Sequence, residues 1–182
     1  MKVLTTKLEG IILIETRKHV DNRGFFLECY EKNRYEKIGI AEDFPQDNQS
    51  RSKKNVLRGL HFTKKTPQSQ ILTVMRGKIF DVVVDIRAKS STFGKWCGVE
   101  LSDEGLNQIY MPCGFAHGYY VLSEYADLHY KVSQRYDPTD EGGLLWSDSD
   151  LGINWPTKNP YVSSRDGSYQ GLKSQKNIFF ER

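Results

Sequence analysis

The sequence predicts an all-β protein, folded as an antiparallel barrel or jelly roll. Short runs rich in β-branched and aromatic residues recur along the chain, and turns that contain glycine or polar residues separate them. One run alternates strictly between apolar and polar residues, as a strand with one buried face does. Only one segment has a helical pattern. A closed sheet of this kind can enclose a cavity for a small ligand.

The length of 182 residues and the mass of 21.0 kDa are those of one domain, large enough to bury a core without disulfides. We therefore expect a single domain over residues 1–182. The end of the chain, from about residue 171 to residue 182, is a mixed tail. We expect Phe179 and Phe180 in this tail to dock on the barrel or on a second subunit.

The expected strands follow one another at short intervals. In order, they cover residues 11–15, 24–30, 47–52, 56–62, 70–76, 78–86, 96–101, 108–111, 116–121 and 126–132. Runs 70–76 and 78–86 meet at Gly77, which can adopt the backbone conformation of a tight turn, so we expect a hairpin there. Residues 31–38 are the one expected helix.

The clearest alternation lies in residues 126–132. Ala126, Leu128, Tyr130 and Val132 share one face of the expected strand, and Asp127, His129 and Lys131 share the other. The sequence therefore predicts that Tyr130 points into an apolar interior and that His129 faces solvent.

Composition and charge exclude several classes of protein. The 26 basic and 23 acidic residues are spread along the chain and leave a net charge of +3, too little for a nucleic-acid-binding surface. No apolar run approaches the roughly 18 residues of a membrane span, and the first ten residues lack a secretion signal. We expect a cytoplasmic protein that binds neither nucleic acid nor membrane. We expect Cys29, Cys97 and Cys113 to be reduced thiols, packed as small hydrophobic groups.

Two of the four histidines lie in apolar runs, His61 in LRGLHF and His117 in MPCGFAHGYY. Taken singly, each is more often a hydrogen-bonded core residue than a catalytic one. The segment from Pro112 through Gly114 to His117 resembles the second motif of the cupin barrels. Metal-binding cupins add two histidines on an earlier strand, where this chain has only His61, so we expect no metal site.

A more specific resemblance runs in order through most of the chain, from about residue 10 to residue 171. Its motifs are DNRGFF at 21–26, QDNQSRS at 46–52, VLRGLHF at 56–62, RGKIFDVVVDIR at 76–87, TFGKW at 92–96, GFAHGYYVLS at 114–123, YKVS at 130–133, EGGLLW at 141–146 and LGINWP at 151–156. Together these motifs resemble the dTDP-4-dehydrorhamnose 3,5-epimerase family.

This resemblance implies a cupin-type jelly roll that forms a homodimer and binds a nucleotide-linked sugar. The family inverts carbons that flank the C4 ketone of a 4-keto-6-deoxyhexose, without a metal or organic cofactor. By position, His61 matches the general base, Tyr130 matches the acid on the opposite face of the sugar, and Asp166 matches the carboxylate that orients His61. These residue types suit the tasks, because near pH 7 an imidazole can accept a proton while a phenol still holds one.

The resemblance also implies residues that bind the substrate. Arg58 and, from the neighbouring subunit, Arg23 match the residues that contact the diphosphate, for which planar guanidinium groups are suited. Arg58 and His61 have opposite parity on a regular strand, so we expect a bulge at Gly59 to turn both inward. The other matching positions are Phe26, Glu28, Gln46, Asn48, Gln70, His117, Glu141 and Arg165.

Proton abstraction next to a ketone forms an enolate, which needs a hydrogen-bond donor at the C4 oxygen. His117 matches a residue that lines this pocket, and Asp85 is either the partner that fixes its tautomer or a solvated charge at a strand end. The sequence departs from the family at Gln70, where a lysine is usual and is thought to hold the enolate. Lys64 or Lys65 could replace that lysine from the loop, although solvated loop residues are the simpler interpretation of both.

We therefore expect an epimerase that acts at C3, C5 or both, and the neutral Gln70 favours inversion of one carbon. A relative that acts on a CDP- or GDP-linked sugar remains open, because the residues expected near the base are generic polar groups. From other classes, a catalytically silent sugar-nucleotide-binding jelly roll and a metal-dependent cupin oxygenase are the alternatives.

Overall fold

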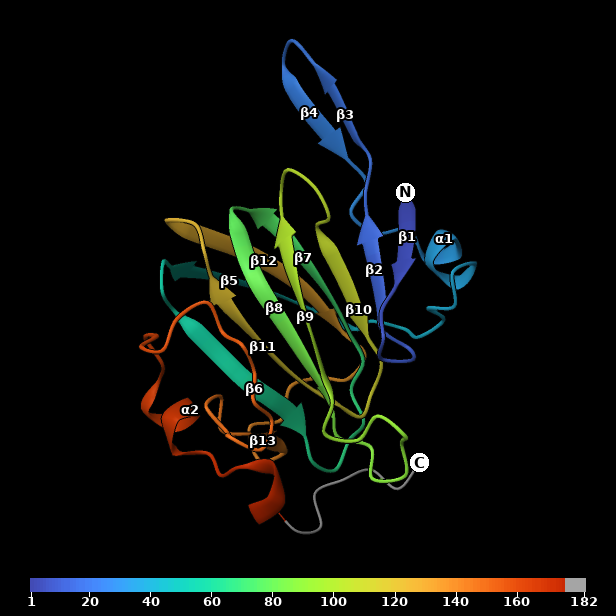
Figure 1. Cartoon of the computed structure of the whole chain (residues 1–182). Coiled ribbons are helices and arrows are strands. Elements are labelled where there is room, and N and C mark those ends of the chain that lie inside the picture. The colour runs from blue at the N-terminus through green and yellow to red at the C-terminus, as the bar shows by residue number, and fades with distance from the viewer. Residues whose placement is uncertain (176–182) are drawn as a thin grey trace.

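Two antiparallel sheets lie face to face in the computed structural model, which describes residues 1–175 (Figure 1). The first sheet has the strand order β1-β2-β10-β7-β12-β5, and the second has the order β13-β6-β11-β8-β9. A separate hairpin of β3 and β4 projects beyond both sheets (Figure 1). The prediction of an all-β antiparallel fold is confirmed.

The strands of the first sheet are β1 (Lys2–Thr5), β2 (Ile12–Glu15), β10 (Gln108–Met111), β7 (Gln70–Arg76), β12 (Tyr125–Val132) and β5 (Gln46–Lys53). Those of the second sheet are β13 (Glu141–Gly143), β6 (Leu57–Thr63), β11 (Phe115–Val121), β8 (Lys78–Asp85) and β9 (Trp96–Ser102). The hairpin consists of β3 (Lys18–Asp21) and β4 (Gly24–Leu27).

The helical elements are short. α1 covers Lys32–Glu36, and its start is fixed by Glu31, whose side chain accepts hydrogen bonds from two amides of the first turn. α2 covers Ser164–Ser168, and the 3-10 turn η1 covers Leu172–Ser174. Within residues 1–175, no helix has the length and apolar character needed to cross a membrane.

The main core fills the space between the two sheets. Alternate residues of each strand point inward, so Leu72 and Leu128 of the first sheet meet Val83 and Val121 of the second sheet. All four side chains are buried. This core holds the two sheets together.

Both sheets also bury part of their outer faces. On the first sheet, Ile14 and Ile71 pack against Tyr35 of α1. On the second sheet, Leu60 and Val82 pack in one cluster with Leu172 of η1. Because β7 and β8 are covered on both faces, each appears in the sequence as a nearly continuous apolar run.

The predicted hairpin between runs 70–76 and 78–86 is wrong. β7 pairs with β10 and β12, whereas β8 pairs with β9 and β11. The chain crosses between the sheets at Gly77, where φ is +86° and an added Cβ would lie 2.1 Å from the carbonyl oxygen of Tyr125. Gly77 is required for this crossing rather than for a two-stranded turn.

Most other predicted strands agree with the structure to within one residue at each end, and runs 70–76 and 108–111 match β7 and β10 at both ends. The run 24–30 is too long, since β4 ends at Leu27, and the helix predicted over 31–38 shortens to α1. The sequence pattern misses β1, β3, β13 and α2. All four residues of β1 are exposed, so no apolar alternation marks this strand.

The alternation over residues 126–132 is confirmed in β12, where Ala126, Leu128 and Val132 are buried and Tyr130 is partly buried. The opposite face is less exposed than predicted. Asp127 is buried under the guanidinium of Arg51, which donates to its two carboxylate oxygens at 2.6 and 2.7 Å. His129 is partly exposed, with its side chain 29% accessible.

The three cysteines are free thiols. Cys29 and Cys97 are half-buried, but Cys113 is exposed, so the prediction that all three pack as small hydrophobic groups is wrong for Cys113. The predicted docking of Phe179 and Phe180 lies outside the described residues.

Candidate active site

A cavity of about 450 Å³ opens between the two sheets. The second sheet contributes His61 from β6 and His117 from β11, and the first sheet contributes Asn48, Gln70 and Tyr130 from β5, β7 and β12. Exposed residues 134–137, in the loop between β12 and β13, complete one side of the lining. The volume is in the range of pockets that bind small organic molecules.

The imidazole of His61 is held by a buried carboxylate. Its Nε2 lies 2.9 Å from Oδ1 of Asp166, and the other oxygen, Oδ2, accepts a hydrogen bond of 3.1 Å from the amide of Gly59. Asp166 lies in the first turn of α2, where the side chain of Ser163 caps the helix by accepting from its amide at 3.0 Å. α2 lies beside β6 at the edge of the second sheet (Figure 1).

Asp166 remains ionised despite its burial. Desolvation alone would raise the pKa of this carboxyl, but the hydrogen bonds from His61 and from the Gly59 amide outweigh it and lower the pKa to about 2. A carboxylate in this position accepts a hydrogen bond from the Nε2–H group of His61. Nδ1 is then the ring nitrogen with a free lone pair, and His61 presents it to the cavity.

The predicted bulge at Gly59 is confirmed. His61 is the register partner of His117, and Arg58 is the register partner of Tyr119. Between these two pairs, β6 therefore has one residue more than β11, which is a β-bulge. Gly59 has a φ of +117°, and a Cβ there would lie 2.5 Å from the Cα of Gly118. The extra residue brings both Arg58 and His61 to the cavity.

Tyr130 lines the cavity from the first sheet, opposite the sheet that carries His61. Burial, followed by the nearby Tyr119, raises the pKa of Tyr130 above its usual value. Its hydroxyl therefore holds its proton at neutral pH. Tyr119 lies on the same face of β11 as His117, and its hydroxyl is 3.3 Å from that of Ser52.

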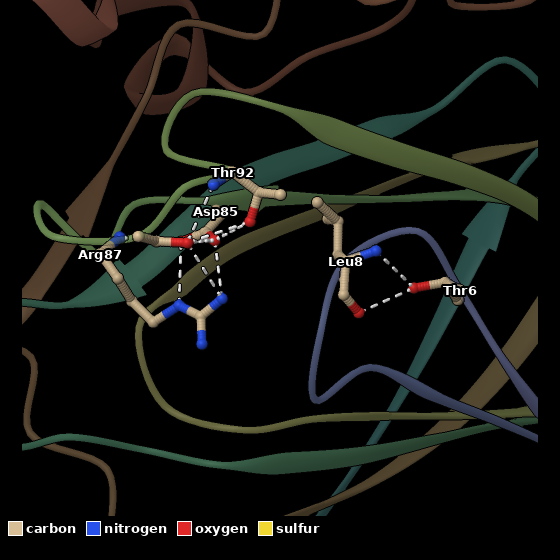
Figure 2. A network of polar contacts seen from close by, with 6 residues as sticks. Thr6, Leu8, Asp85, Arg87 and Thr92 are labelled. Carbon is tan, nitrogen blue, oxygen red and sulfur yellow. Dashed lines mark hydrogen bonds and ion pairs between the residues drawn. The ribbon is translucent and has the colours of Figure 1, made fainter.

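Asp85 is not the partner of His117, so this expectation is wrong. The carboxylate of Asp85 binds Arg87, Ser90 and Thr92, as Figure 2 illustrates for Arg87 and Thr92. It is not a solvated charge either, because its side chain is fully buried. These hydrogen bonds overcome the effect of burial and lower the pKa of Asp85 to about 2. The carboxylate that contacts His117 is Asp81, at 2.7 Å from Nε2.

The cavity brings together most of the other predicted binding residues. Gln46 donates to Asn48 at 2.8 Å, and Gln70 donates to Gln68 at 3.0 Å. Arg58 donates to Ser52 at 3.0 Å. Glu141 and Arg165, both in the lining, form an ion pair with each other.

Lys64 and Lys65 are not among the cavity-lining residues. Their amides, together with the amide of Thr66, bind the buried carboxylate of Asp140. The simpler interpretation, that both are loop residues, agrees with these positions.

Arg23, Phe26 and Glu28 do not reach the cavity of their own chain. Arg23 and Phe26 belong to the β3–β4 hairpin, which projects beyond both sheets (Figure 1). The side chain of Arg23 is 85% exposed and pairs with Asp21. Glu28, directly after β4, pairs with Arg34 at 3.0 Å. Within the described chain these three residues are therefore separate from the cavity that the others line.

Several cavity residues escaped the sequence interpretation. Tyr119 could have been found, because it shares the face of His117 at the strand period of two. Arg135 and Tyr136 lie in a loop and carry no periodic signal, although Tyr136 lies 3.3 Å from Glu141. No cluster of three potential metal ligands occurs in residues 1–175.

The arrangement suits proton transfer. An imidazole held by a carboxylate and a protonated phenol face one cavity from opposite sheets, and such a pair can remove and deliver protons by general acid–base catalysis. The guanidinium of Arg58, in the same lining, can bind an anionic group of a ligand.

Comparisons with known proteins identify the family of this chain. Residues 5–174 match the family described as dTDP-4-dehydrorhamnose 3,5-epimerase. A relative with this name from Salmonella typhimurium is 45% identical over 171 residues, which cover 92% of this chain and 93% of the relative. A dTDP-4-dehydrorhamnose 3-epimerase from Streptomyces niveus is 39% identical, covering 91% of this chain and 81% of the relative.

A solved structure extends the likeness to three dimensions. The crystal structure of dTDP-6-deoxy-D-glucose-3,5-epimerase from Legionella pneumophila, in complex with dTDP-4-keto-L-rhamnose, superposes with a TM-score of 0.91 at 42% sequence identity. The match covers 94% of this chain and 93% of the Legionella chain. The fold is thus the cupin-type jelly roll of these epimerases. This chain belongs to the dTDP-4-dehydrorhamnose 3,5-epimerase family of isomerases.

Proposed function

We propose that this protein is a cofactor-independent epimerase of a nucleotide-linked 4-keto-6-deoxyhexose, with dTDP-4-dehydro-6-deoxyglucose as the expected substrate. It inverts C3, C5 or both, next to the C4 ketone. The observation that carries the proposal is the imidazole–carboxylate pair of His61 and Asp166 facing the same cavity as the Tyr130 phenol. The activities named for the relatives support the substrate class.

In the proposed reaction, Nδ1 of His61 removes the proton from the carbon next to the ketone. The electrons of the C–H bond form a double bond between that carbon and C4, and the C4 carbonyl oxygen becomes an enolate oxygen. Asp166 keeps the ring in position and stabilises the imidazolium that forms, as the aspartate of a catalytic triad does. The cost of forming the imidazolium is lower because the carboxylate is already ionised and buried beside it.

Tyr130 then delivers its phenolic proton to the opposite face of the same carbon, and the enolate returns to the ketone. Inversion follows because the base and the acid belong to different sheets and approach the sugar from different sides. The phenolate and the imidazolium exchange protons with water before the next turnover.

The substrate's diphosphate is proposed to bind the guanidinium of Arg58. A second guanidinium, from Arg23, is proposed to arrive from the partner subunit of a homodimer, since the hairpin that carries Arg23 projects beyond both sheets and Arg23 does not line the cavity of its own chain. Phe26 and Glu28 would accompany it. In its own cavity each chain would add Gln46, Asn48, Glu141 and Arg165 as contacts to the nucleotide and the sugar. A cytoplasmic location in a deoxysugar pathway is part of the same proposal.

A single-carbon epimerase is the second candidate. Gln70 lines the cavity with a neutral amide, which stabilises an enolate less than an ammonium does. A substrate that needs one inversion passes through one enolate and tolerates the weaker donor better than a substrate that needs two. The 3-epimerase from Streptomyces niveus is a relative with a single-carbon activity in its name.

The test is an incubation with 4-keto-6-deoxy sugars linked to dTDP, CDP and GDP in heavy water, followed by NMR. We expect deuterium at C3, C5 or both of the dTDP-linked sugar, together with an inverted product. Binding of these compounds without any deuterium would instead identify a catalytically silent binding protein. Exchange on a CDP- or GDP-linked sugar alone would correct the nucleotide.

A further inference from the structure

His117 has its own buried carboxylate, separate from that of His61. Its Nε2 lies 2.7 Å from Oδ2 of Asp81 on β8, and the Asp81 side chain is fully buried. The other oxygen, Oδ1, is buried and has no hydrogen-bond partner among the residues that the structure describes. A buried carboxylate in this setting is costly unless a positive charge or a proton compensates it.

The contact with Asp81 leaves the second ring nitrogen of His117 for the cavity. Nδ1 makes no hydrogen bond within residues 1–175, and it is not among the buried polar atoms that lack a partner there. Since His117 lines the cavity, Nδ1 is accessible from it. A ligand atom can therefore meet this nitrogen directly.

The proton count of the pair decides what Nδ1 can do. With one proton, on Nε2, the pair bears one negative charge in the core and Nδ1 is only an acceptor. With a second proton the pair is neutral overall and Nδ1–H is a donor, whichever group holds the proton between them. Because Asp81 is fully buried, the neutral pair costs less to bury than the charged one.

We propose that Asp81 is a positioning residue that keeps the His117–Asp81 pair doubly protonated, so that His117 donates from Nδ1 to the C4 oxygen of the enolate. This inference deepens the proposed function and rests on it. His117 and His61 are register partners on adjacent strands, which places their side chains roughly 5 Å apart on one face. A base at C3 or C5 and a donor at the neighbouring C4 oxygen fit such a pair.

The composition of the lining makes this donor important. No lysine lines the cavity within residues 1–175, and Gln70 contributes a neutral amide. Arg165 is paired with Glu141, and Arg58 donates to Ser52. His117 lies beside His61 on the adjacent strand. A charge-assisted hydrogen bond from His117 to the enolate is roughly twice as strong as a neutral hydrogen bond. It supplies the enolate stabilisation that Gln70 alone does not.

The titratable groups around the pair come from several elements. They are His61 of β6 with its partner Asp166, Arg58 of β6, Tyr119 of β11, Tyr130 of β12 and Cys97 of β9. The rings of Tyr119 and His117 have their centroids 6.4 Å apart. Burial above all, and also the charge of Asp81, raise the pKa of the Cys97 thiol. Within residues 1–175, only His117 hydrogen-bonds to the Asp81 side chain.

Nitrogen NMR of the imidazoles in the substrate-free protein tests the protonation state without any assumption about the substrate. In the wild type we expect Nδ1 of His117 to carry a proton at pH 7. Asp81→Asn removes the carboxylate beside Nε2 and should change which ring nitrogens of His117 carry a proton at pH 7. An unprotonated Nδ1 in the wild type at pH 7 overturns the inference, and so does identical protonation of the His117 ring in both proteins. The wild-type result holds even if the variant does not fold.

Asp85→Asn is the matched control. Asp85 is an equally buried carboxylate on β8, but it contacts Arg87 and Thr92 instead of His117 (Figure 2). This variant should leave the protonation of the His117 ring at pH 7 unchanged, although it should lower the stability of the protein. The same change in ring protonation in Asp85→Asn as in Asp81→Asn would overturn the specific link to Asp81.

Kinetics separate positioning from structural damage. Asp81→Asn should lower kcat for deuterium exchange by about tenfold or more, since it weakens a donor to the enolate, and should leave the Kd for dTDP unchanged because dTDP has no C4 oxygen. Loss of dTDP binding, or an unchanged kcat, contradicts the inference. If no sugar nucleotide exchanges deuterium with the wild type, the proposed function fails, while the NMR result on His117 is still decided separately.

Discussion

His61 and Asp166 are 105 positions apart in the chain, yet Nε2 of His61 lies 2.9 Å from Oδ1 of Asp166. The second oxygen of Asp166 accepts a hydrogen bond from the amide of Gly59, two residues before His61. One carboxylate therefore holds both the imidazole and the bulged backbone beside it. The orientation of the base and the shape of β6 depend on the same side chain.

Asp166→Asn should keep the binding of dTDP but lower turnover by about one hundred-fold or more, by analogy with other histidine–carboxylate pairs. The amide can still accept a hydrogen bond from the ring, but it does not stabilise the imidazolium. Calorimetry with dTDP and deuterium exchange by NMR measure the two quantities. Near-normal exchange in this variant would mean that the pair of His61 and Asp166 is not the catalytic base.

The same substitution should change how stability depends on pH. The pKa of Asp166 is lowered to about 2 in the folded protein, so its charge stabilises the fold above the unfolded-state pKa near 4. This contribution, about 2 kcal/mol, is lost as the pH falls through 4 toward 2. Urea unfolding at fixed protein concentration should show a difference between wild type and Asp166→Asn at pH 6 that shrinks at lower pH. A difference that is independent of pH would contradict the assignment.

Tyr130→Phe should separate proton removal from proton delivery, because phenylalanine keeps the apolar face of β12 and deletes the acid. We expect deuterium to enter the substrate faster than the carbon is inverted, since His61 returns protons to the face from which it took them. Tyr125→Phe, on the exposed end of the same strand, is the control and should leave both rates unchanged. An equal loss of exchange and inversion in Tyr130→Phe would identify Tyr130 as a positioning residue instead.

Arg23 and His61 should complement each other across a homodimer. Mixing Arg23→Ala chains with His61→Ala chains should restore activity, because a heterodimer contains one site with both residues intact. The control mixture joins His61→Ala with Asp166→Asn, whose residues lie in one chain's site, and should restore nothing. If Arg23→Ala and His61→Ala chains form heterodimers without regaining activity, Arg23 does not serve the partner's cavity.

Gln70→Lys should extend the reaction to a second carbon. The wild type is expected to label mainly one of C3 and C5 with deuterium, and the ammonium of the variant should raise labelling at the other carbon by giving a charge-assisted bond. Gln68→Lys is a matched control, since Gln68 lines the same cavity and is the hydrogen-bond partner of Gln70. Rapid and equal labelling of both carbons by the wild type would contradict the interpretation of Gln70.

Local patterns in the sequence predicted individual strands well but not their partners. The alternation over residues 126–132 placed Tyr130 on the inner face of β12, because a period of two is a property of one strand. The predicted hairpin at Gly77 was wrong because β7 and β8 are covered on both faces. Such strands have no polar face, so their sequence does not indicate which sheet each of them joins. Sheet membership depends on packing among distant segments.

The partner of His117 failed for a related reason. Asp81 and Asp85 lie on the same face of β8, so the strand period cannot choose between them. The register does not choose either, since His117 pairs with Val83, midway between the two aspartates. The side-chain contacts do, because Asp85 binds Arg87 and Thr92 while Asp81 contacts His117. Asp166 came only from the resemblance to a family, because α2 has no apolar periodicity and its contact with His61 is long-range.

Solvent deuterium exchange with dTDP-4-dehydro-6-deoxyglucose, compared between wild type and His61→Ala, tests the central proposal most directly. The proposal predicts that the wild type introduces deuterium at C3, C5 or both and that His61→Ala introduces none above the uncatalysed rate, while both proteins bind dTDP. His61 is the only cavity imidazole that contacts Asp166 within residues 1–175, so no other group should replace it as base. Exchange by His61→Ala at a rate near that of the wild type would contradict the proposal.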